Sequence, residues 1–386
     1  MAGAFRIDKL PPYLFAEIDK KIAAEKAKGV DVISLGIGDP VEPTPAHIVE
    51  RLVKEARDPR NHQYPSYYGL PEFRQAISRW YKKRFGVDLD PDTEILPLIG
   101  SKEGIAHIFT ALVDPGAAAL IPDPGYPVYR TGALLAGGEA HLMPLVKDND
   151  FNPRFDALEE SQLNKAKILF LNYPNNPTAA VAREGLLAEA VAIGRDNDIT
   201  VCHDFAYSEI TFDGYTAPSI LETPGAKDTA VEFHSLSKTY NMTGWRCGWV
   251  AGSAGIIEAL GRVKTNIDSG IFNAIQLAGV TALDGPQDCV EEMRGIYQRR
   301  RDIVVDALTK AGYEVSRPKG SVFVWMPVPE GHTSASFATN VLEKAGVVLS
   351  PGNAYGPSGE GYVRISLTVK DERLEEALDR INRRLE

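Results

Sequence analysis

The sequence contains few cysteines and no long apolar run. Its three cysteines, Cys202, Cys247 and Cys289, are odd in number and form no Cys-x-x-Cys pair, which argues against a disulfide framework and fits a reducing compartment. No apolar stretch approaches the roughly 20 residues that a membrane-spanning helix needs, and the N-terminus lacks the apolar core of a signal peptide. We therefore expect a cytoplasmic protein with no membrane partner.

An excess of basic charge is also missing. The chain has 52 acidic and 42 basic residues, and its formal net charge is -10. Nucleic-acid binding proteins normally carry a basic patch, so we expect no nucleic-acid partner. The pair Gly36 and Gly38 lacks the third glycine and the early strand–helix–strand context of a dinucleotide fingerprint, which argues against a nicotinamide enzyme. No set of residues indicates a metal.

The pattern of the chain indicates an α/β protein. From about residue 100, helical patterns follow Gly104, Arg183 and Ala254, and they alternate with short apolar segments at 118–121, 168–172, 199–204, 231–234 and 248–252. Apolar strands that alternate with helices predict a mainly parallel mixed sheet covered by helices on both faces.

The pattern changes after about residue 284. A charged helix at 291–310 is followed by apolar segments at 321–326 and 362–367, each with a helix after it, which predicts a smaller α+β domain. A helix at 14–28 and a strand at 32–35 come earlier in the chain. We therefore expect an N-terminal arm at 1–14, part of the small domain at 15–40, a large domain at 41–284 and the rest of the small domain at 285–386.

One polar turn after a predicted strand suits a phosphate monoester that carries an aldehyde. Ser235, Ser237 and Lys238 share this turn, and Arg246 follows eight residues after the lysine. Hydroxyls and a guanidinium bind phosphate oxygens, while a lysine amine in a desolvated, cationic site deprotonates easily and can condense with an aldehyde. The tetrapeptide alone also fits a solvated lysine, but the motifs below argue against that alternative.

Asp204 ends another predicted strand, where open α/β sheets gather their ligand sites. Its carboxylate can pair with a protonated pyridine nitrogen, which turns the ring into an electron sink, or it can simply cap the next helix. Tyr207, three residues later, can donate to a phenolic oxygen of such a ring. His203 is predicted to be a packed side chain rather than a catalyst.

Four further segments offer polar or aromatic groups to a ligand. Asn176 lies in a proline-rich turn that can hold its side chain rigidly. Gly100 and Ser101 open a helix whose free amides can bind an anion or can be ordinarily capped. Tyr126 can stack on a planar ring or pack in the core. Arg364 lies within an apolar strand and must be paired, either by a substrate carboxylate or by an internal salt bridge.

In this order, the motifs resemble those of the fold type I pyridoxal-phosphate (PLP) aminotransferases of class I/II, over essentially the whole chain. The resemblance implies pyridoxal 5'-phosphate as cofactor. Lys238 would carry it and move a proton between substrate and cofactor. Asp204 would hold the ring nitrogen, and Tyr126 would stack on the ring. Tyr207 and Asn176 would hold the phenolic oxygen. The phosphate would be held by Ser101, Lys102, Ser235, Ser237 and Arg246.

The resemblance also implies substrate contacts and a homodimer with shared sites. Arg364 and the backbone at Gly38 would bind the substrate α-carboxylate. Tyr64 matches a tyrosine that reaches the phosphate of the neighbouring subunit. The segments 10–15, 35–39, 103–107, 232–242 and 264–273 are most similar to those of the LL-diaminopimelate aminotransferase subgroup, in which Tyr13 and Asn273 would contact substrate.

That subgroup implies amino transfer from LL-2,6-diaminopimelate to 2-oxoglutarate, which yields tetrahydrodipicolinate and glutamate for lysine synthesis. Alternatives are aminotransferases for aspartate, aromatic amino acids, alanine or N-succinyl-diaminopimelate, a PLP β-lyase, and a PLP-binding regulator. One departure from the family is Ala179, which stands where glycine is usual after Asn-Pro-Thr. We expect the backbone there not to need a positive φ.

Overall fold

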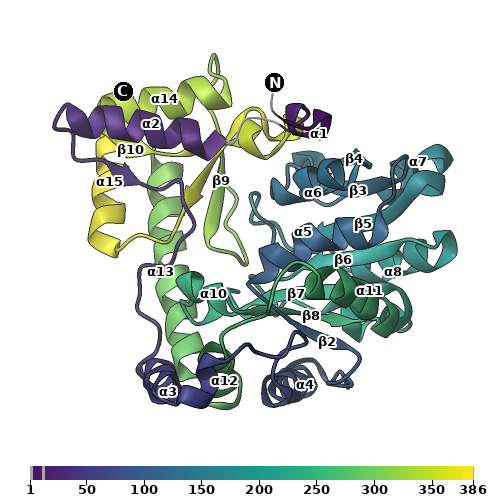
Figure 1. Ribbon diagram of the computed structural model, residues 1–386. Coiled ribbons are helices and arrows are strands. Elements are labelled where there is room, and N and C mark those ends of the chain that lie inside the picture. The colour runs from purple at the N-terminus through teal and green to yellow at the C-terminus, as the bar shows by residue number, and fades with distance from the viewer. Residues whose placement is uncertain (1–2, 11–13, 386) are drawn as a thin grey trace.

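The computed structural model describes residues 3–10 and 14–385, and its largest element is a seven-stranded sheet (Figure 1). Five neighbouring strands run parallel, and β8 is antiparallel to both of its neighbours. In spatial order the strands are β2 (Ile95–Leu98), β8 (Gly248–Gly252), β7 (Ala230–Ser235), β6 (Thr200–Asp204), β5 (Ala166–Asn172), β3 (Ala118–Asp123) and β4 (Glu139–Pro144). The expected mainly parallel mixed sheet is confirmed.

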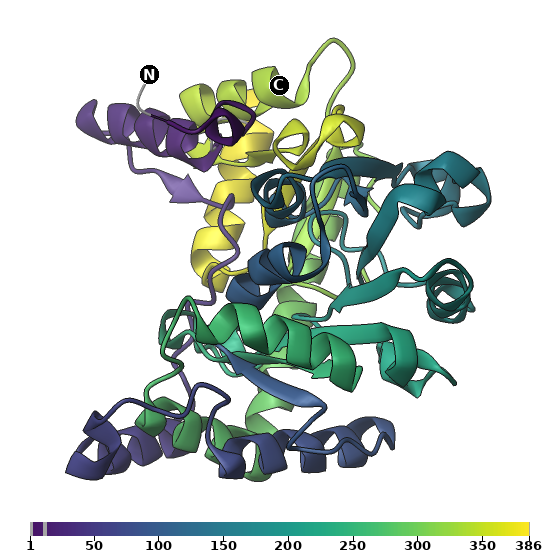
Figure 2. The same cartoon turned by 45° about the vertical axis from the view of Figure 1, so that its right-hand side comes forward.

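Helices cover both faces of this sheet because its strands are apolar on both sides. In β5, Ile168 and Phe170 pack into one hydrophobic cluster, whereas Leu169 and Leu171 pack into the other. The helices of the first face are α5 (Ser101–Leu112), α6 (Val128–Ala136) and α11 (Ala254–Thr265). Those of the second are α3 (Ala46–Ala56), α4 (Pro71–Phe85), α8 (Leu186–Asn197) and α12 (Asn273–Asp284). Figure 2 shows these layers obliquely.

A third hydrophobic cluster forms the core of the remaining, smaller part. Its antiparallel sheet has the order β11 (Ser350–Pro351), β12 (Tyr362–Ser366) and β9 (Phe323–Pro327), and β1 (Ile33–Ser34) pairs in parallel with β10 (Val347–Val348). Its long helices are α2 (Leu14–Ala27), α13 (Asp288–Lys310), α14 (Ser334–Ala345) and α15 (Asp371–Leu385). The shorter helices of the chain are α1 (Phe5–Asp8), α7 (Glu160–Lys165), α9 (Ala226–Thr229) and α10 (Leu236–Thr239).

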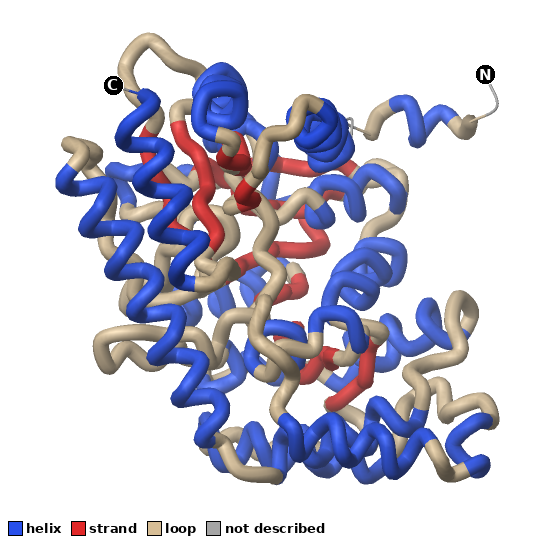
Figure 3. Tube along the Cα trace, turned by 90° about the vertical axis from the view of Figure 1, so that its left-hand side faces the viewer, coloured by secondary structure: helices blue, strands red, loops and turns tan. Residues whose placement is uncertain are grey.

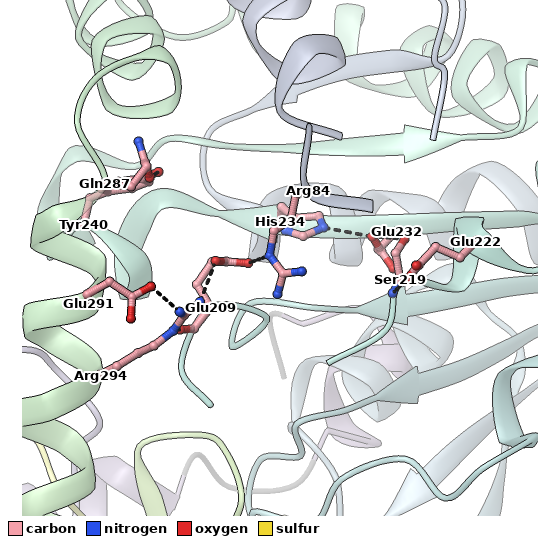
Figure 4. A network of polar contacts seen from close by, with 10 residues as sticks. All are labelled: Arg84, Glu209, Ser219, Glu222, Glu232, His234, Tyr240, Gln287, Glu291 and Arg294. Atoms are coloured by element: carbon pink, nitrogen blue, oxygen red, sulfur yellow. Dashed lines mark hydrogen bonds and ion pairs between the residues drawn. The ribbon is translucent and has the colours of Figure 1, made fainter. Parts of the chain in front are cut away.

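Helix α13 ties the two parts together and runs along one side of the molecule (Figure 3). Its residue Arg294 donates to a carboxylate oxygen of Glu209 at 3.0 Å, and Arg84 of α4 donates to the other oxygen of the same carboxylate at 2.9 Å (Figure 4). Strands β5 and β6 end at Asn172 and Asp204, side by side in register, on the edge of the sheet that faces the smaller part. Ligand sites of open α/β sheets lie at such an edge.

Candidate active site

A cavity of about 450 Å³ lies between the sheet edge and the smaller part. It brings together residues that are up to 345 positions apart in the sequence, from Asp19 to Arg364. Among the residues singled out from the sequence, the cavity is lined by Gly38, Ser101, Lys102, Tyr126, Asn176, Asp204, Tyr207, Ser235, Ser237, Lys238, Arg246 and Arg364.

Three of the expected site residues are not among those that line this cavity. The side chain of Tyr64 is 87% exposed. Asn273 is the first residue of α12, and its half-buried side chain has an Oδ1 with no hydrogen-bond partner. Tyr13 lies outside the described residues. Of these, Tyr64 is predicted to serve a neighbouring subunit, a role that a single chain does not test.

Lys238 lies in α10, directly after β7, and its amine points into the cavity. The ammonium donates a 2.5 Å hydrogen bond to the carbonyl oxygen of Gly38. Burial lowers the pKa of Lys238 to about 8; Asp39 opposes this shift, and the charges of Arg364 and Arg246 add to it. A lysine of this kind supplies the neutral amine near physiological pH, which is the nucleophilic form.

Asp204 presents one unpaired carboxylate oxygen to the cavity. Its Oδ2 accepts a 2.7 Å hydrogen bond from the hydroxyl of Tyr129, while its buried Oδ1 has no partner among the described residues. Burial raises the pKa of Asp204, and the Tyr129 hydroxyl acts in the opposite direction. Burial likewise raises the pKa of Tyr207, which keeps its hydroxyl a donor. An unpaired buried acceptor is costly, so this oxygen suits a cationic ring nitrogen.

An anion cradle forms where α5 and α10 begin. The Ser235 hydroxyl caps α10 by accepting from the amide of Ser237 at 3.2 Å, and the buried Ser237 hydroxyl has no partner in the described part of the chain. Gly100, with φ 74°, lets the guanidinium of Arg246 pack against the start of α5, because a Cβ on Gly100 would overlap that guanidinium. Free amides, hydroxyls and a guanidinium converge as a phosphate group requires.

Arg364 of β12 is buried without a carboxylate partner among the described residues. Its guanidinium donates to the side-chain oxygen of Asn176 at 2.6 Å and to the carbonyl of Gly36 at 2.7 Å, and its Nε has no partner within residues 3–10 and 14–385. It lies 3.9 Å from the ring centre of Phe323 and 4.9 Å from that of Tyr355. No internal salt bridge satisfies this charge in the described part of the chain, so the group is poised for an external carboxylate.

The backbone at Ala179 contradicts the expectation drawn from the sequence. Its φ is 58°, in the left-handed region that favours glycine. The turn imposes this angle, since the amide of Ala179 donates to the carbonyl of Asn175 at 3.0 Å and the amide of Asn175 donates to the carbonyl of Ala180 at 2.9 Å. The chain therefore tolerates a Cβ where the turn prefers glycine, at a cost of about 1 kcal/mol.

Sequence reasoning missed several residues that line the cavity or support it. Tyr129 follows Tyr126 by three residues at the start of α6, and this spacing was the only signal that it shares the site. The cavity is also lined by Asp19, Ile37, Asp39, Pro127, Asn172, Ala206, Thr243, Phe323 and Tyr355. His203 is fully buried and is not among the lining residues.

The residues present fit pyridoxal 5'-phosphate. Lys238 offers an amine for its aldehyde, Asp204 an unpaired oxygen for its ring nitrogen, and the Ser237 hydroxyl with Arg246 a cradle for its phosphate. When bound, the cofactor supplies an electron sink that acidifies the α-proton of an amino acid.

Comparison with known proteins agrees with this fit. The family model described as aminotransferase class I and II matches residues 30–381. The LL-diaminopimelate aminotransferase of Moorella thermoacetica is 57% identical over 99% of this chain and 98% of its own, and that of Desulforudis audaxviator is 56% identical over 98% and 96%.

Among solved structures, substrate-bound BacF from Bacillus subtilis superposes with a TM-score of 0.96 at 37% identity, over 99% of this chain and 98% of its own. In the described ranges 3–10 and 14–385, no helix has the length and apolar character needed to cross a membrane. The chain belongs to the class I and II aminotransferases and is a PLP-dependent enzyme of that family.

Proposed function

We propose that this enzyme transfers an amino group from LL-2,6-diaminopimelate to 2-oxoglutarate, giving tetrahydrodipicolinate and glutamate. The name and the near full-length similarity of the two curated relatives support this substrate. The observation that carries the reaction class is the buried guanidinium of Arg364, which has no carboxylate partner among the described residues and lines the same cavity as the Lys238 amine. This pairing suits an α-amino acid, whose carboxylate and reacting carbon lie close together.

The residue roles in this proposal are those that the family resemblance implies, and the lining of one cavity by these residues supports them. The Arg364 guanidinium and the backbone at Gly38 would hold the substrate carboxylate, and the Lys238 amine would accept and return the proton of the substrate α-carbon. Asp204 keeps the ring nitrogen cationic. Tyr207 and Asn176 hold the phenolic oxygen, Tyr126 stacks on the ring, and the phosphate contacts are Ser101, Lys102, Ser235, Ser237 and Arg246.

Two acidic side chains favour a substrate with a second ammonium group. Asp19 of α2 and Asp39 line the same cavity as Lys238 and Arg364. A diamino acid brings a distal ammonium that these carboxylates can pair with. Aspartate, alanine and aromatic amino acids carry no second cation, and N-succinylation removes it from diaminopimelate.

The amounts of glutamate and ammonia that form distinguish between the alternative reactions. With LL-diaminopimelate and 2-oxoglutarate, we expect one glutamate per donor consumed and no ammonia. A β-lyase would release ammonia without a keto acid, and faster turnover of aspartate, aromatic amino acids, alanine or N-succinyl-diaminopimelate would reassign the donor. A regulator would bind PLP and turn over none of them.

We also infer a homodimer with shared sites. Tyr64 is 87% exposed, and the exposed apolar side chains of Tyr67, Tyr68, Ile267 and Phe272 lie in the same loop or in the loop before α12. Apolar surface of this kind is typical of protein interfaces. In the dimer, Tyr64 would reach the phosphate of the neighbouring site, and Asn273 and Tyr13 would contact substrate.

Mixing two inactive variants tests the shared site. Lys238→Ala removes the reactive amine and Tyr64→Ala removes the contribution to the other subunit. A hybrid dimer contains one site with both wild-type residues, so activity should appear after the two proteins are mixed and subunits exchange. If mixing restored no activity although hybrids formed, Tyr64 would serve its own subunit or none.

The cytoplasmic location and the division into an arm, a small domain at 15–40 and 285–386, and a large domain at 41–284 belong to the same proposal. The separate hydrophobic cluster that joins Ile33 and Leu35 to residues of β9, α14 and α15 supports the division. The three cysteines are free, and two of them are buried, which agrees with a reducing compartment.

A further inference from the structure

A fully buried carboxylate lies behind the cofactor edge of the sheet. Glu232 of β7 is 0% exposed. Its Oε1 accepts hydrogen bonds from Tyr81 (3.0 Å), Ser219 (2.9 Å) and His234 (2.9 Å), and its Oε2 accepts from the amide of Ile220 (2.9 Å) and contacts Nδ1 of His203 (3.0 Å). Figure 4 shows the contact between His234 and Glu232.

These contacts favour an ionised Glu232. Tyr81, Ser219 and the amide of Ile220 donate to its two oxygens, so a proton on the acid could point only at a ring nitrogen of His203 or His234. Burial pushes the pKa of Glu232 upward, but the hydrogen bonds from His203 and His234 outweigh burial and hold it at about 2. A buried anion of this kind needs a cation beside it.

The hydrogen-bond pattern of His203 identifies that cation. Its Nδ1 lies 3.0 Å from Oε2 of Glu232, and its Nε2 lies 3.2 Å from the carbonyl oxygen of Tyr173. A carbonyl oxygen and an ionised Glu232 can only accept, so with Glu232 ionised both ring nitrogens carry a hydrogen, which makes the ring an imidazolium. His234 contacts an acceptor through Nε2 at 2.9 Å, and a neutral ring satisfies that contact.

Two links connect His203 with the active site. It precedes Asp204 in β6, and because side chains alternate along a strand, the imidazolium lies behind the carboxylate that faces the cavity. Burial raises the pKa of Asp204, whereas the Tyr129 hydroxyl and the charge of His203 lower it. Through the Tyr173 carbonyl, His203 also holds the start of the turn that carries Asn176.

We propose that His203 is a permanently protonated positioning residue that, paired with Glu232, keeps Asp204 ionised and anchors the turn of Asn176. The second half of this statement rests on the proposed contact of Asp204 with the cofactor nitrogen, whereas the protonation of His203 does not. The titratable groups next to the pair of His203 and Glu232 are His234 of β7, Tyr81 of α4, Tyr173 after β5, and Asp204 of β6.

Nitrogen NMR of the holoenzyme tests the protonation directly. With ¹⁵N-labelled histidine, and His203 assigned by its absence in His203→Gln, both ring nitrogens should remain protonated from about pH 6 to 9, beyond the ordinary histidine range. Titration of His203 to a neutral ring within this range would overturn the proposal, whatever the enzyme's substrate.

A double-variant comparison separates charge from structure. Glu232→Gln and His203→Gln each leave one buried group without its counter-charge, so each should lower the free energy of unfolding, while the double variant should recover most of it. The rate of amino transfer from glutamate to bound PLP should nevertheless fall about tenfold in the double variant, the size of one lost interaction with a charged group, because Asp204 loses the nearby charge that favours its ionised form, and the pH profile should shift.

The variant His141→Gln is the control, because its half-buried ring lies on the edge strand β4 and pairs with Glu139 at 3.3 Å, and it should match the wild type in rate and pH profile. A double variant with wild-type rate and pH profile would show that the pair serves stability alone and would overturn the positioning role. Loss of amino transfer from every donor in the wild type would instead contradict the proposed function.

Discussion

At the scale of single residues, the cavity is defined by buried polar atoms that have no hydrogen-bond partner among the residues that the structure describes. Asp204 Oδ1, Ser237 Oγ and Arg364 Nε are all of this kind. A buried unpaired group costs about 1–3 kcal/mol, more when charged, so a fold that keeps three of them around one reactive lysine is built for a ligand with matching groups. Asp204 Oδ1 suits a cationic nitrogen, Ser237 Oγ suits a phosphate and Arg364 Nε suits a carboxylate. The three atoms therefore match three different parts of the ligands.

Arg364→Lys should lower kcat/KM about 10- to 100-fold for the amino acid and for the keto acid alike. Lysine keeps the charge but loses the planar fork that grips a carboxylate, and a hydrogen bond to a charged group contributes about 1.5–3 kcal/mol. Steady-state kinetics with both substrates measures this loss. Arg154→Lys, at an exposed arginine paired with Asp156, is the control and should have no effect. Equal kinetics of the two variants would remove Arg364 from substrate binding.

The titration of Lys238 predicts a pH dependence of stability in the PLP-free enzyme. Its pKa is lowered from 10.5 to about 8, so between these values the unfolded chain binds more protons than the folded one. The free energy of unfolding then rises with pH across this window, by roughly 3 kcal/mol in all. Urea unfolding of the wild type and Lys238→Met should diverge between about pH 8 and 10.5. Parallel profiles would mean that the amine titrates normally.

At the scale of elements, the start of α5 depends on a glycine. Gly100→Ala places a Cβ against the Arg246 guanidinium at a positive φ, so it should both strain the backbone by about 1 kcal/mol and displace the arginine. We expect PLP to dissociate at least about tenfold more readily, the size of one lost charged hydrogen bond.

Gly86→Ala is the matched control for this prediction, because its φ is 71° and nothing lies within 4 Å of the added Cβ. It should lose similar stability and keep its affinity for PLP. Dialysis against buffer, with the visible absorbance of the bound cofactor as readout, separates the two variants. Equal retention of PLP would show that Arg246 does not depend on Gly100.

At Ala179, removing a Cβ is expected to stabilise the protein, whereas adding one at Gly100 or Gly86 is expected to destabilise it. Ala179→Gly removes the strain of a Cβ at φ 58° and should raise the free energy of unfolding by about 1 kcal/mol. Ala180→Gly, at the neighbouring residue without a positive φ, should instead lower it by about 0.5–1 kcal/mol. Thermal unfolding of the holoenzymes measures both. A loss of stability in both variants would mean that the backbone is not strained at Ala179.

Apolar strands that end in a polar residue were predictable from the sequence. The apolar runs before Asn172, Asp204 and Ser235 are strands, and parallel pairing brings the ends of β5, β6 and β7 to one edge. The angle at Ala179 was not predictable, because the residue type argued against it and the hydrogen bonds of the turn decided it. Tyr129 was missed because its bond to Asp204 joins residues 75 positions apart.

At the scale of the whole molecule, the smaller part completes the cavity that the sheet begins. Arg364 and Phe323 come from its antiparallel sheet, and Asp19 comes from α2, which lies beside α14 in Figure 1. The sequence predicted the two architectures separately. It held no signal for how they pack, since Asp19 appears as one charge of an ordinary amphipathic helix and only the packing of α2 places it at the cavity.

The measurement that most directly tests the central claim is a half-reaction with single amino acids. The PLP form is mixed with one amino acid at a time and no keto acid, and the absorbance of the cofactor is followed as it accepts the amino group. We predict conversion by LL-diaminopimelate and by glutamate, and none by aspartate or phenylalanine. Conversion by another amino acid and not by LL-diaminopimelate would contradict the proposed substrate, and no conversion by any amino acid would contradict amino transfer at Lys238.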